Sequence, residues 1–381
     1  MAERIVAISD FCTPLPVEPP PDIAPDYRAA WARAAAGAGR AIPDAPEVTG
    51  SYLERLPLAA VRAGLAETAE VWSFAGTDAA RCADAGGRPL RRAFRADGPA
   101  PHPSADILAH LDAFGPPAIL CTWGLGVDAA ILARSAASVR VYNSIDAPAL
   151  RIPEAISRHI DLFLTSADWQ AEEIRARHPG AVSATMPVGP EFASPETFFP
   201  TGARKDFDVI YVAAAQPYKR HDILLDAFAR LPPTLRGLCV FGYGEDAEAI
   251  RAEIARRGLN ILCLGPPGLS YRDVNALMNR TRIGVVCGEE DGAPAILTEY
   301  MLAGLPVLAN ARLRCGLAYI RPDTGLTAAP EHFAEAILHL LGAAPNLAPR
   351  RVVLENWVWE KTIERFAALV DRARREKSRA A

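Results

Sequence analysis

The chain has 381 residues, a length typical of two domains, and 50% of them are hydrophobic, which suffices for ordinary globular cores. Its 41 lysines and arginines nearly balance its 45 aspartates and glutamates, which argues against nucleic-acid binding because such proteins usually carry a basic excess. No stretch reaches about 18 uncharged apolar residues, so we expect no membrane span, while a peripheral membrane contact stays open.

The seven cysteines contain no C-x-x-C pair and mostly lie in apolar, strand-like runs. They predict reduced, buried thiols rather than a disulfide framework or a zinc site. The amino terminus, MAERIVAISDF, is charged and then strand-like, without the apolar core of a secretion signal. Together these features predict a cytoplasmic protein.

The first half of the chain predicts alternating strands and helices after an irregular start. Residues 4–9 predict a strand, and residues 13–26 are rich in proline and should be irregular. Further on, the expected helices are 27–38, 52–66, 127–136 and 152–160, and the expected strands are EVWSFAG, 118–123, 139–145 and 161–166. This alternation predicts βαβ units and a parallel sheet.

A break at residues 193–206 interrupts both periodicities with proline and glycine, and we place the domain boundary there. The predicted parts are 1–195, a linker at 196–206, 207–350, and a carboxyl-terminal helix within 351–381, for which packing back on the first domain stays open. That helix is expected at about 355–377, with one apolar stripe of Trp357, Trp359, Ile363, Phe366 and Val370.

The second half repeats the α/β pattern. Its expected strands are 208–214, 238–244, 260–265 and 282–288, and its expected helices are 221–231, 246–258 and 273–281. Open parallel sheets bind ligands outside the carboxyl ends of their strands. We therefore look for chemistry in the loops that follow these strands, at 213–220, 242–246, 265–270 and 288–296.

The stretch EEDGAPAILTEYMLAGLPVLAN at 289–310 joins an acidic loop to a helix that carries one carboxylate. Asp291 is expected in the loop, Gly292 permits a tight or positive-φ backbone, and Pro294 suits the first turn of a helix over 294–302. Glu299 then falls in the second turn. Helix amino termini suit phosphates and ionised carboxylates accept hydrogen bonds from hydroxyls, so the layout matches a nucleotide sugar.

This stretch resembles the acidic signature of retaining glycosyltransferases of family 4 (group 1), which have the GT-B fold. The signature is a Glu, seven residues, a second Glu, and then Ala-x-Gly-x-Pro-Val. Here Asp291 and Glu299 take the two acidic positions, followed by Met301-Leu302-Ala303-Gly304-Leu305-Pro306-Val307. The family implies that the first acid binds hydroxyls of the donor sugar and that Glu299 holds the ribose. Aspartate at the first position is a departure from the pattern.

A second match is AAAQPYKRHDILLDAF at 213–228, which resembles the loop that opens the family's carboxyl-terminal domain. Lys219 aligns with the lysine expected on the diphosphate, where an ammonium stabilises the leaving group. The family's partner arginine falls on Ala214, so that cation is missing, although Arg220 is adjacent. The stretches FGYGED and LGPPGLSYRDV resemble the family's loops around the nucleotide base. The resemblance covers about 186–370.

The resemblance implies a catalytic set and a donor-binding set. The catalytic set is Asp291, Glu299 and Lys219, and Glu289 or Glu290 could replace Asp291. The donor-binding set is Gly292, Ala293, Pro294, Ile296, Leu297, Arg220, Gly242, Gly244 and Pro266. Residues that end strands of the first domain could face an acceptor: Asp10, Trp123 and Asp146. The D-x-D of Asp206-Phe207-Asp208 precedes a strand, away from the expected site, and we predict no required metal.

The resemblance therefore implies an α/β GT-B fold, with two Rossmann-like, doubly wound domains that face each other across a cleft. The first would bind the acceptor and the second the nucleotide sugar. The implied activity is that of a hexosyltransferase in glycan biosynthesis, which moves a sugar from a UDP- or GDP-sugar, with retention and without a further cofactor. The acceptor, whether a glycan, a lipid-linked or a small molecule, is unknown. A nucleotide-sugar-binding protein without transfer activity and a nucleotide-sugar epimerase are the alternatives.

Overall fold

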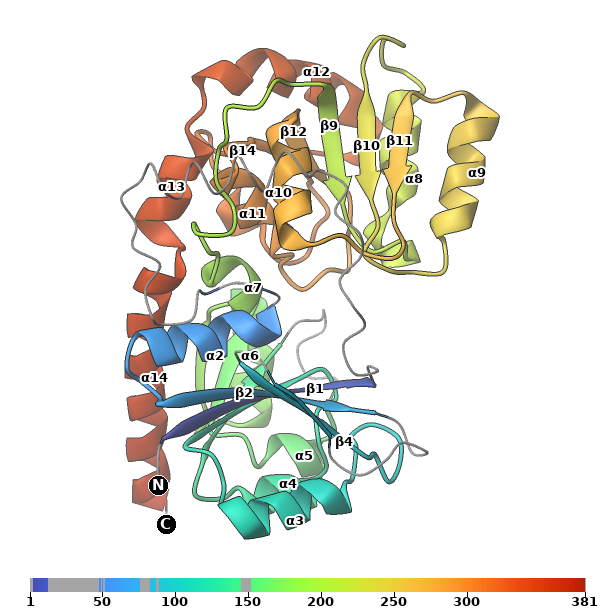
Figure 1. Cartoon of the computed structure of the whole chain (residues 1–381). Helices are drawn as coiled ribbons and strands as arrows, with labels where there is room; N and C mark the ends of the chain where they lie inside the picture. Colours follow the sequence, from blue (N-terminus) through green and yellow to red (C-terminus); the bar gives the residue numbers. More distant parts are fainter. Residues whose placement is uncertain are drawn as a thin grey trace. The chain divides into compact units, whose positions relative to one another are not determined.

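The computed structural model describes residues 3–12, 48, 50, 52–75, 83–86, 89–144 and 152–380. It divides into two compact units, each built on its own sheet (Figure 1). Among the described residues, unit 1 contains those before 193 and those after 358, and unit 2 contains 193–358. The helix expected near 27–38 lies outside the described residues. Within the described residues, unit 2 is thus one continuous segment, whereas unit 1 is assembled from both ends of the chain.

Within the described residues, the sheet of unit 1 has eight strands in the order β3-β4-β2-β1-β5-β6-β7-β8. All neighbouring pairs are parallel except β3 and β4. The strands are β1 (Arg4–Cys12), β2 (Thr68–Phe74), β3 (Ala83–Gly86), β4 (Leu90–Phe94), β5 (Ile119–Trp123), β6 (Val139–Asn143), β7 (Leu162–Thr165) and β8 (Val182–Thr185). The strands predicted at 4–9, 118–123, 139–145 and 161–166 are confirmed.

Helices cover both faces of this sheet, and polar caps fix where two of them begin. Ser104 Oγ accepts from the Ile107 amide at 3.2 Å, and Asp128 Oδ1 accepts from the Ile131 amide at 3.0 Å, each satisfying an amide that the helix leaves unpaired. The helices are α2 (Tyr52–Arg62), α3 (Ala105–Phe114), α4 (Ala129–Arg134), α5 (Glu154–Ser157), α6 (Asp168–Arg177), α7 (Val188–Glu191) and α14 (Trp359–Ala380).

The sheet of unit 2 has six strands in the order β11-β10-β9-β12-β13-β14, all parallel among the described residues. The strands are β9 (Phe207–Val212), β10 (Gly237–Val240), β11 (Ile261–Leu264), β12 (Thr281–Val286), β13 (Val307–Asn310) and β14 (Gly325–Ala328). The helical segments are η1 (Pro217–Lys219), α8 (His221–Phe228), α9 (Ala247–Arg257), α10 (Tyr271–Asn279), α11 (Ile296–Leu302), η2 (Leu317–Tyr319), η3 (Pro330–His332), α12 (Phe333–Ala343), η4 (Ala344–Asn346) and α13 (Pro349–Asn356).

The strand order of unit 2 defines a switch point between β9 and β12. The chain winds outward from β9 to β11 and then returns to place β12 on the other side of β9. The loops that follow β9 and β12 therefore meet at this switch point, and the carboxyl edge at a switch point is the usual ligand site of such sheets. Apolar side chains pack against both faces of this sheet, so its carboxyl edge is a rigid platform.

The prediction of a single helix at about 355–377 is wrong at its start, because the chain forms two helices there. Helices α13 and α14 are separated at Trp357 and Val358. Trp357 packs against Tyr319 in unit 2, with ring centroids 4.8 Å apart. The rest of the predicted stripe is buried in the core of unit 1: Trp359, Ile363, Phe366 and Val370. A helical periodicity continued across the break because both helices are amphipathic and no proline or glycine separates them.

Helix α14 is a structural part of unit 1, where it contacts and crosses α2 (Figure 1). Thr362 Oγ1 donates to the Glu191 carbonyl at 2.5 Å, and Arg365 pairs with the Glu191 carboxylate at 3.0 Å. Near its end, Lys377 Nζ lies 3.0 Å from Oδ2 of Asp161. Polar contacts at both ends thus reinforce the apolar stripe, so the last helix completes the first unit.

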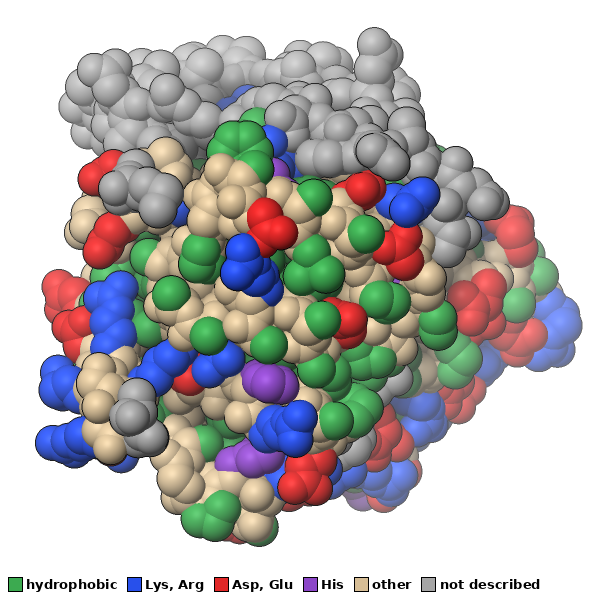
Figure 2. Space-filling view, turned by 90° about the horizontal axis from the view of Figure 1, so that it is seen from below, with side chains coloured by type: hydrophobic (Ala, Val, Ile, Leu, Met, Phe, Trp, Pro, Cys, Tyr) green, Lys and Arg blue, Asp and Glu red, His purple; other side chains and the backbone are tan. Residues whose placement is uncertain are grey.

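Within the described chain, every helix is too short or too polar to cross a membrane. On the face seen in Figure 2, acidic and basic side chains are interspersed with apolar ones. This mixed distribution matches the near balance of charge in the sequence.

Candidate functional site

Two loops meet at the switch point of unit 2, and an ion pair joins them. Lys219 ends the turn that follows β9, and Asp291 lies in the loop after β12; the Lys219 ammonium pairs with the Asp291 carboxylate. Their side chains are only 14% and 11% exposed. The Tyr211 hydroxyl of β9 donates to the Lys219 carbonyl at 2.6 Å, which anchors this turn to the sheet. Two residues of the predicted catalytic set are therefore in direct contact.

Arg220 makes a second link between the same loops. Its Nη1 lies 2.6 Å from Oε1 of Glu289, and its Nε and Nη2 donate to the two oxygens of Asp222 at 2.9 and 2.8 Å. The hydrogen bonds that Arg220 donates to Asp222, and then the charges of Asp222 and Glu289, raise the pKa of Arg220, so its charge is permanent. Arg220 adopts a left-handed backbone, with φ 51° and ψ 50°, immediately before α8. An arginine carries no local signal for this conformation, so it was not predicted.

The loop after Asp291 differs from the expectation in two respects. The left-handed residue is Ala293, with φ 60°, not Gly292, whose amide instead donates to Asp291 Oδ1 at 3.0 Å. Helix α11 begins at Ile296, beyond Pro294, so Glu299 falls in its first turn and not in its second. Glu299 is thus closer to the mouth of the helix than predicted, and it is only 6% exposed.

Tyr300 fixes α11 against the sheet. Its hydroxyl donates to the Ile210 carbonyl at 3.2 Å and accepts from the Val212 amide at 2.7 Å, both in β9. Its ring lies where a Cβ on Gly284 of β12 would be, since such an atom would lie 2.4 Å from the ring. The side chains of Ile296 and Leu297 are buried in the same core, so only their backbone could touch a ligand. Glu299, beside Tyr300, is therefore held by a rigid helix.

Glycines of the neighbouring loops permit close backbone packing at the same edge. Gly244 has φ 120°, and a Cβ there would lie 2.2 Å from the Ala215 carbonyl oxygen. Ala215 accepts from the Asp246 amide at 3.0 Å and donates to the Tyr243 carbonyl at 2.7 Å. The loop after β9 is thus hydrogen-bonded to the loop after β10.

The loop after β11 packs on the loop after β10. Gly265 is left-handed, with φ 74°, and cis peptide bonds precede Pro266 and Pro267. A Cβ on Gly268 would lie 3.1 Å from the Gly242 carbonyl oxygen. All four loops singled out in the second half of the sequence therefore lie at the carboxyl ends of the strands of one sheet.

His221, for which the sequence indicated only a helix start, is a buried member of this edge. Its ring packs between Tyr211 and Phe241, with centroids 4.8 and 5.4 Å away. Burial, and then the charge of Lys219, lower the pKa of His221 to about 4. The imidazole is therefore neutral near pH 7 and adds no charge beside Lys219.

The residues proposed for the acceptor side belong to unit 1. Trp123 ends β5 and is fully buried in the core of that unit. The side chain of Asp10 and the whole of Asp146 lie outside the described residues. In unit 2, Ala214 stands where the family resemblance implies an arginine, and its methyl group is buried.

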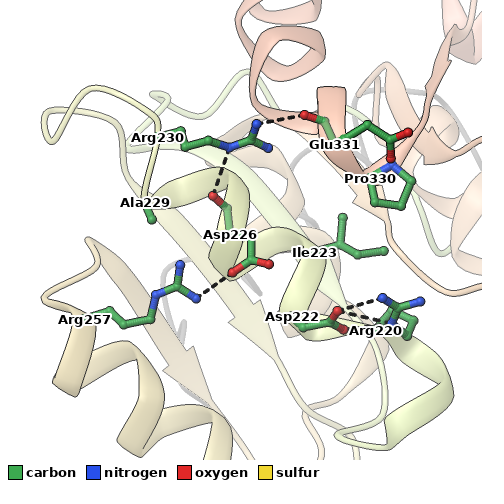
Figure 3. Close-up of a pocket in the computed structure, with 9 residues that line it drawn as sticks. All are labelled: Arg220, Asp222, Ile223, Asp226, Ala229, Arg230, Arg257, Pro330 and Glu331. Carbon is green, nitrogen blue, oxygen red and sulfur yellow. Dashed lines mark hydrogen bonds and ion pairs between the residues drawn. The ribbon is translucent and has the colours of Figure 1, made fainter.

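A cavity of about 560 Å³ lies beside α8 (Figure 3). It includes Arg220 but not Lys219, Asp291 or Glu299. The other two arginines of the cavity contact residues that line it. Arg257 pairs with Asp226 at 2.8 Å, and Arg230 donates to the Glu331 carbonyl at 2.8 Å. Apart from Arg220, the cavity thus shares no lining residue with the site at the switch point. Its lining consists of Arg220, Asp222, Ile223, Asp226, Ala229, Arg230, Arg257, Pro330 and Glu331.

The described residues contain no cluster of three or more His, Cys, Asp or Glu side chains that could hold a metal ion. The carboxylates of the D-x-D sequence are paired with arginines. Asp206 lies 2.8 Å from Arg280, and Asp208 lies 3.0 Å from Arg282. These ion pairs give the two aspartates a structural role at the start of β9.

Comparison with known proteins shows what this arrangement is similar to. The sequence profile of the family described as "Glycosyl transferases group 1" matches residues 194–347, most of unit 2. Most of unit 2 is therefore similar in sequence to group 1 glycosyl transferases. No curated protein matches the sequence.

Solved structures extend the likeness to the whole fold. Sucrose-phosphate synthase from Thermosynechococcus elongatus has a TM-score of 0.67 at 16% identity and covers 100% of both chains. HepE from Anabaena, in complex with UDP and glucose, has a TM-score of 0.62 at 12% identity and covers 96% of this chain and 99% of its own. These likenesses confirm the predicted fold class, GT-B with two Rossmann-like units.

The pneumococcal O-GlcNAc transferase GtfA, in complex with UDP and GlcNAc, has a TM-score of 0.56 at 14% identity. The match covers 71% of this chain, which spans only 60% of the length of GtfA.

Proposed function

We propose that the protein is a retaining, family 4 glycosyltransferase that moves a hexose from a nucleotide sugar to an acceptor. The observation that carries this proposal is the direct pairing of Lys219 with Asp291 at the switch point, beside the helix that holds Glu299. A cation for the diphosphate and carboxylates for the sugar hydroxyls are the groups that such a donor requires. The group 1 profile match over unit 2 supports the same assignment.

In the proposed reaction, the nucleotide sugar separates Lys219 from Asp291 and contacts both side chains itself. The diphosphate takes the Lys219 ammonium, and Asp291 is released to accept hydrogen bonds from hydroxyls of the donor sugar. Glu299, fixed by Tyr300, accepts from the ribose hydroxyls. As the sugar departs, Lys219 stabilises the negative charge that develops on the diphosphate, which itself takes the proton of the acceptor hydroxyl.

We propose a UDP-sugar as the donor, with a GDP-sugar as the next candidate. The support is that HepE and GtfA, which share the fold, were solved with UDP and a sugar. No further cofactor is needed in this scheme, and a cytoplasmic role in glycan biosynthesis follows from the same proposal. The acceptor is left open between a glycan, a lipid-linked and a small molecule, as is a peripheral membrane contact.

One observation favours a second candidate, a nucleotide-sugar-binding protein that does not transfer the sugar. Ala214 supplies no cation, and Arg220, the adjacent candidate, is already held by Asp222 and Glu289. Loss of one charge-stabilising group can cost roughly 10²–10³ in rate, by analogy with oxyanion holes. Binding without turnover would identify this function.

A binding assay with matched variants tests the proposal. Thermal shifts with UDP-, GDP-, ADP- and dTDP-sugars should show stabilisation by one class, of about 2.7 kcal/mol at 100 times the dissociation constant. Lys219→Ala and Glu299→Gln should lose this shift, whereas Arg230→Ala, in the separate cavity, should keep it. Absence of any shift in the folded protein would refute a competent donor site. A shift without sugar transfer or hydrolysis would favour the binding protein.

A further inference from the structure

Two cysteines lie side by side on neighbouring strands of unit 2. Cys239 of β10 is in register with Cys263 of β11, and both pack in the hydrophobic cluster on one face of the sheet. Adjacent strands are about 4.8 Å apart, and disulfides span Cα separations of about 4.4–6.8 Å. The backbone therefore already holds these two residues within bridging distance, on the same face.

The two thiols influence each other's ionisation. The neighbouring Cys263 thiol, and then burial, raise the pKa of Cys239. The neighbouring Cys239 thiol, together with the charge of Arg251, lowers the pKa of Cys263. Arg251 is itself held in place, because it donates to the Gly265 carbonyl and its guanidinium lies 5.7 Å from the Phe241 ring. Cys263 is thus the thiol of the pair that ionises more readily, and the thiolate is the reactive form of cysteine.

Accessibility separates Cys263 from the other cysteines whose side chains are described. Cys263 is partly exposed on an edge strand, next to Leu262, which is 48% exposed. The buried thiols are Cys121, Cys239, Cys287 and Cys315. Burial strongly raises the pKa of Cys121, which makes it a suitable internal reference. One thiol of the pair is thus open to a reagent, and the other is shielded behind it.

We propose that Cys263 and Cys239 form a peroxide-reactive dithiol, in which Cys263 is the attacking thiol and Cys239 the resolving one. The Cys263 thiolate attacks one oxygen of hydrogen peroxide, the O–O bond breaks, and hydroxide leaves, giving a sulfenic acid. The Cys239 thiol then displaces water from that sulfur and forms the disulfide. Two thiols are oxidised and one peroxide is reduced to two waters, so the step balances. This inference does not depend on the proposed glycosyltransferase activity.

Peptide mapping of the whole protein tests this directly. Trypsin cleavage after Arg236, Arg251, Arg257 and Arg272 puts Cys239 in peptide 237–251 and Cys263 in peptide 258–272. After treatment with hydrogen peroxide and alkylation without reductant, these two peptides should appear joined, two hydrogens lighter than their sum. Dithiothreitol should separate them again. Two separate peptides, each alkylated or with Cys263 overoxidised, would overturn the proposal.

Two variants assign the roles, and a third is the control. Cys239→Ala should trap Cys263 as sulfenic acid, which dimedone labels, whereas Cys263→Ala should leave Cys239 unmodified by peroxide. Cys121→Ala should form the linked peptide as the unaltered protein does. In the unaltered, folded protein, iodoacetamide should label Cys263 at least tenfold faster than Cys121. Equal labelling rates, or a dimedone adduct on Cys239, would contradict the assignment without any question of misfolded variants.

Discussion

The Nη1 atom of Arg220 lies 2.6 Å from Oε1 of Glu289, next to the ion pair between Lys219 and Asp291. Two consecutive cations of one loop therefore face two carboxylates of the other across the switch point of the sheet. The charges of these two loops neutralise one another, so an anionic ligand must compete with Asp291 for Lys219. This competition predicts different effects for removing the cation and removing the carboxylate.

Lys219→Ala should weaken binding of both UDP and a UDP-sugar by about tenfold or more, since a hydrogen bond to a charged group contributes about 1.5–3 kcal/mol. Asp291→Asn keeps the shape but removes the competing charge. It should bind UDP at least as tightly as the unaltered protein, while losing the extra affinity for the sugar. Titration calorimetry with both ligands measures this. Equal weakening of UDP binding by both substitutions would contradict the exchange of partners.

The left-handed backbone of Arg220 predicts an order of stability between two substitutions. Arg220→Gly and Arg220→Ala lose the same guanidinium and differ only in the Cβ, which is unfavourable at φ 51°. After allowing for the greater flexibility of glycine in the unfolded chain, the free energy of unfolding of Arg220→Gly should be higher by about 0.5–1 kcal/mol. Urea unfolding of both proteins measures the difference. An alanine variant that is the more stable one would show that this turn relaxes.

Gly244 and Gly242 lie in one loop, and alanine substitutions at the two positions can be compared directly. A methyl group on Gly244 would meet the Ala215 carbonyl oxygen at 2.2 Å, with φ at 120°, whereas one on Gly242 would meet nothing within 4 Å. Gly244→Ala should lower the free energy of unfolding by about 3 kcal/mol or more, and Gly242→Ala should change it by less than about 1 kcal/mol. Thermal unfolding of the two variants tests this. Similar melting temperatures would contradict the close approach of the two loops.

The lowered pKa of His221 predicts a fall in the free energy of unfolding in mild acid. Its pKa is about 4 in the folded protein and about 6.5 in the unfolded chain, so only the unfolded chain binds a proton between these values. The contribution is fully present above pH 6.5 and is lost as the pH falls toward 4. It amounts to about 2 kcal/mol between pH 7.5 and 5.

His221→Phe retains a ring between Tyr211 and Phe241 but removes the titration. Its free energy of unfolding should therefore fall less between pH 7.5 and 5 than that of the unaltered protein, by the amount that His221 contributes. Urea titrations at both pH values give the difference. Parallel pH profiles for the two proteins would show that the imidazole titrates normally.

The sequence predicted the positions of the site loops well, because strand ends and the spacing of charged residues pointed to the same places. Strand ends and the acidic spacing located the loops of unit 2, because parallel strands bring their carboxyl ends to one edge. Conformation inside those loops was not predictable from residue type. The sequence favoured Gly292 for positive φ, yet Ala293 adopts it, while the Gly292 amide donates to the Asp291 side chain. Tertiary contacts of this kind leave no local signal.

The sequence also could not predict which acidic residue pairs with which basic residue. The sequence favoured Asp291 and left Glu289 and Glu290 as alternatives, but in the structure the three acids have different partners. Asp291 pairs with Lys219, Glu289 with Arg220, and Glu290 with Arg314. Only the three-dimensional arrangement of two loops, about seventy residues apart in the chain, distinguishes them. The division of the last helices between two units was hidden for the same reason, since both halves have the same periodicity.

The position of α14 in unit 1 has a consequence for how the chain matures during its synthesis. Residues 193–358 form the whole of the described unit 2, and they leave the ribosome before α14 is made. Domains usually fold in order from the amino terminus. Here the first unit must wait for Trp359, Phe366 and Val370 to fill its core. The second unit can therefore be complete while the first still exposes an apolar surface, and a stalled chain would display that surface to chaperones.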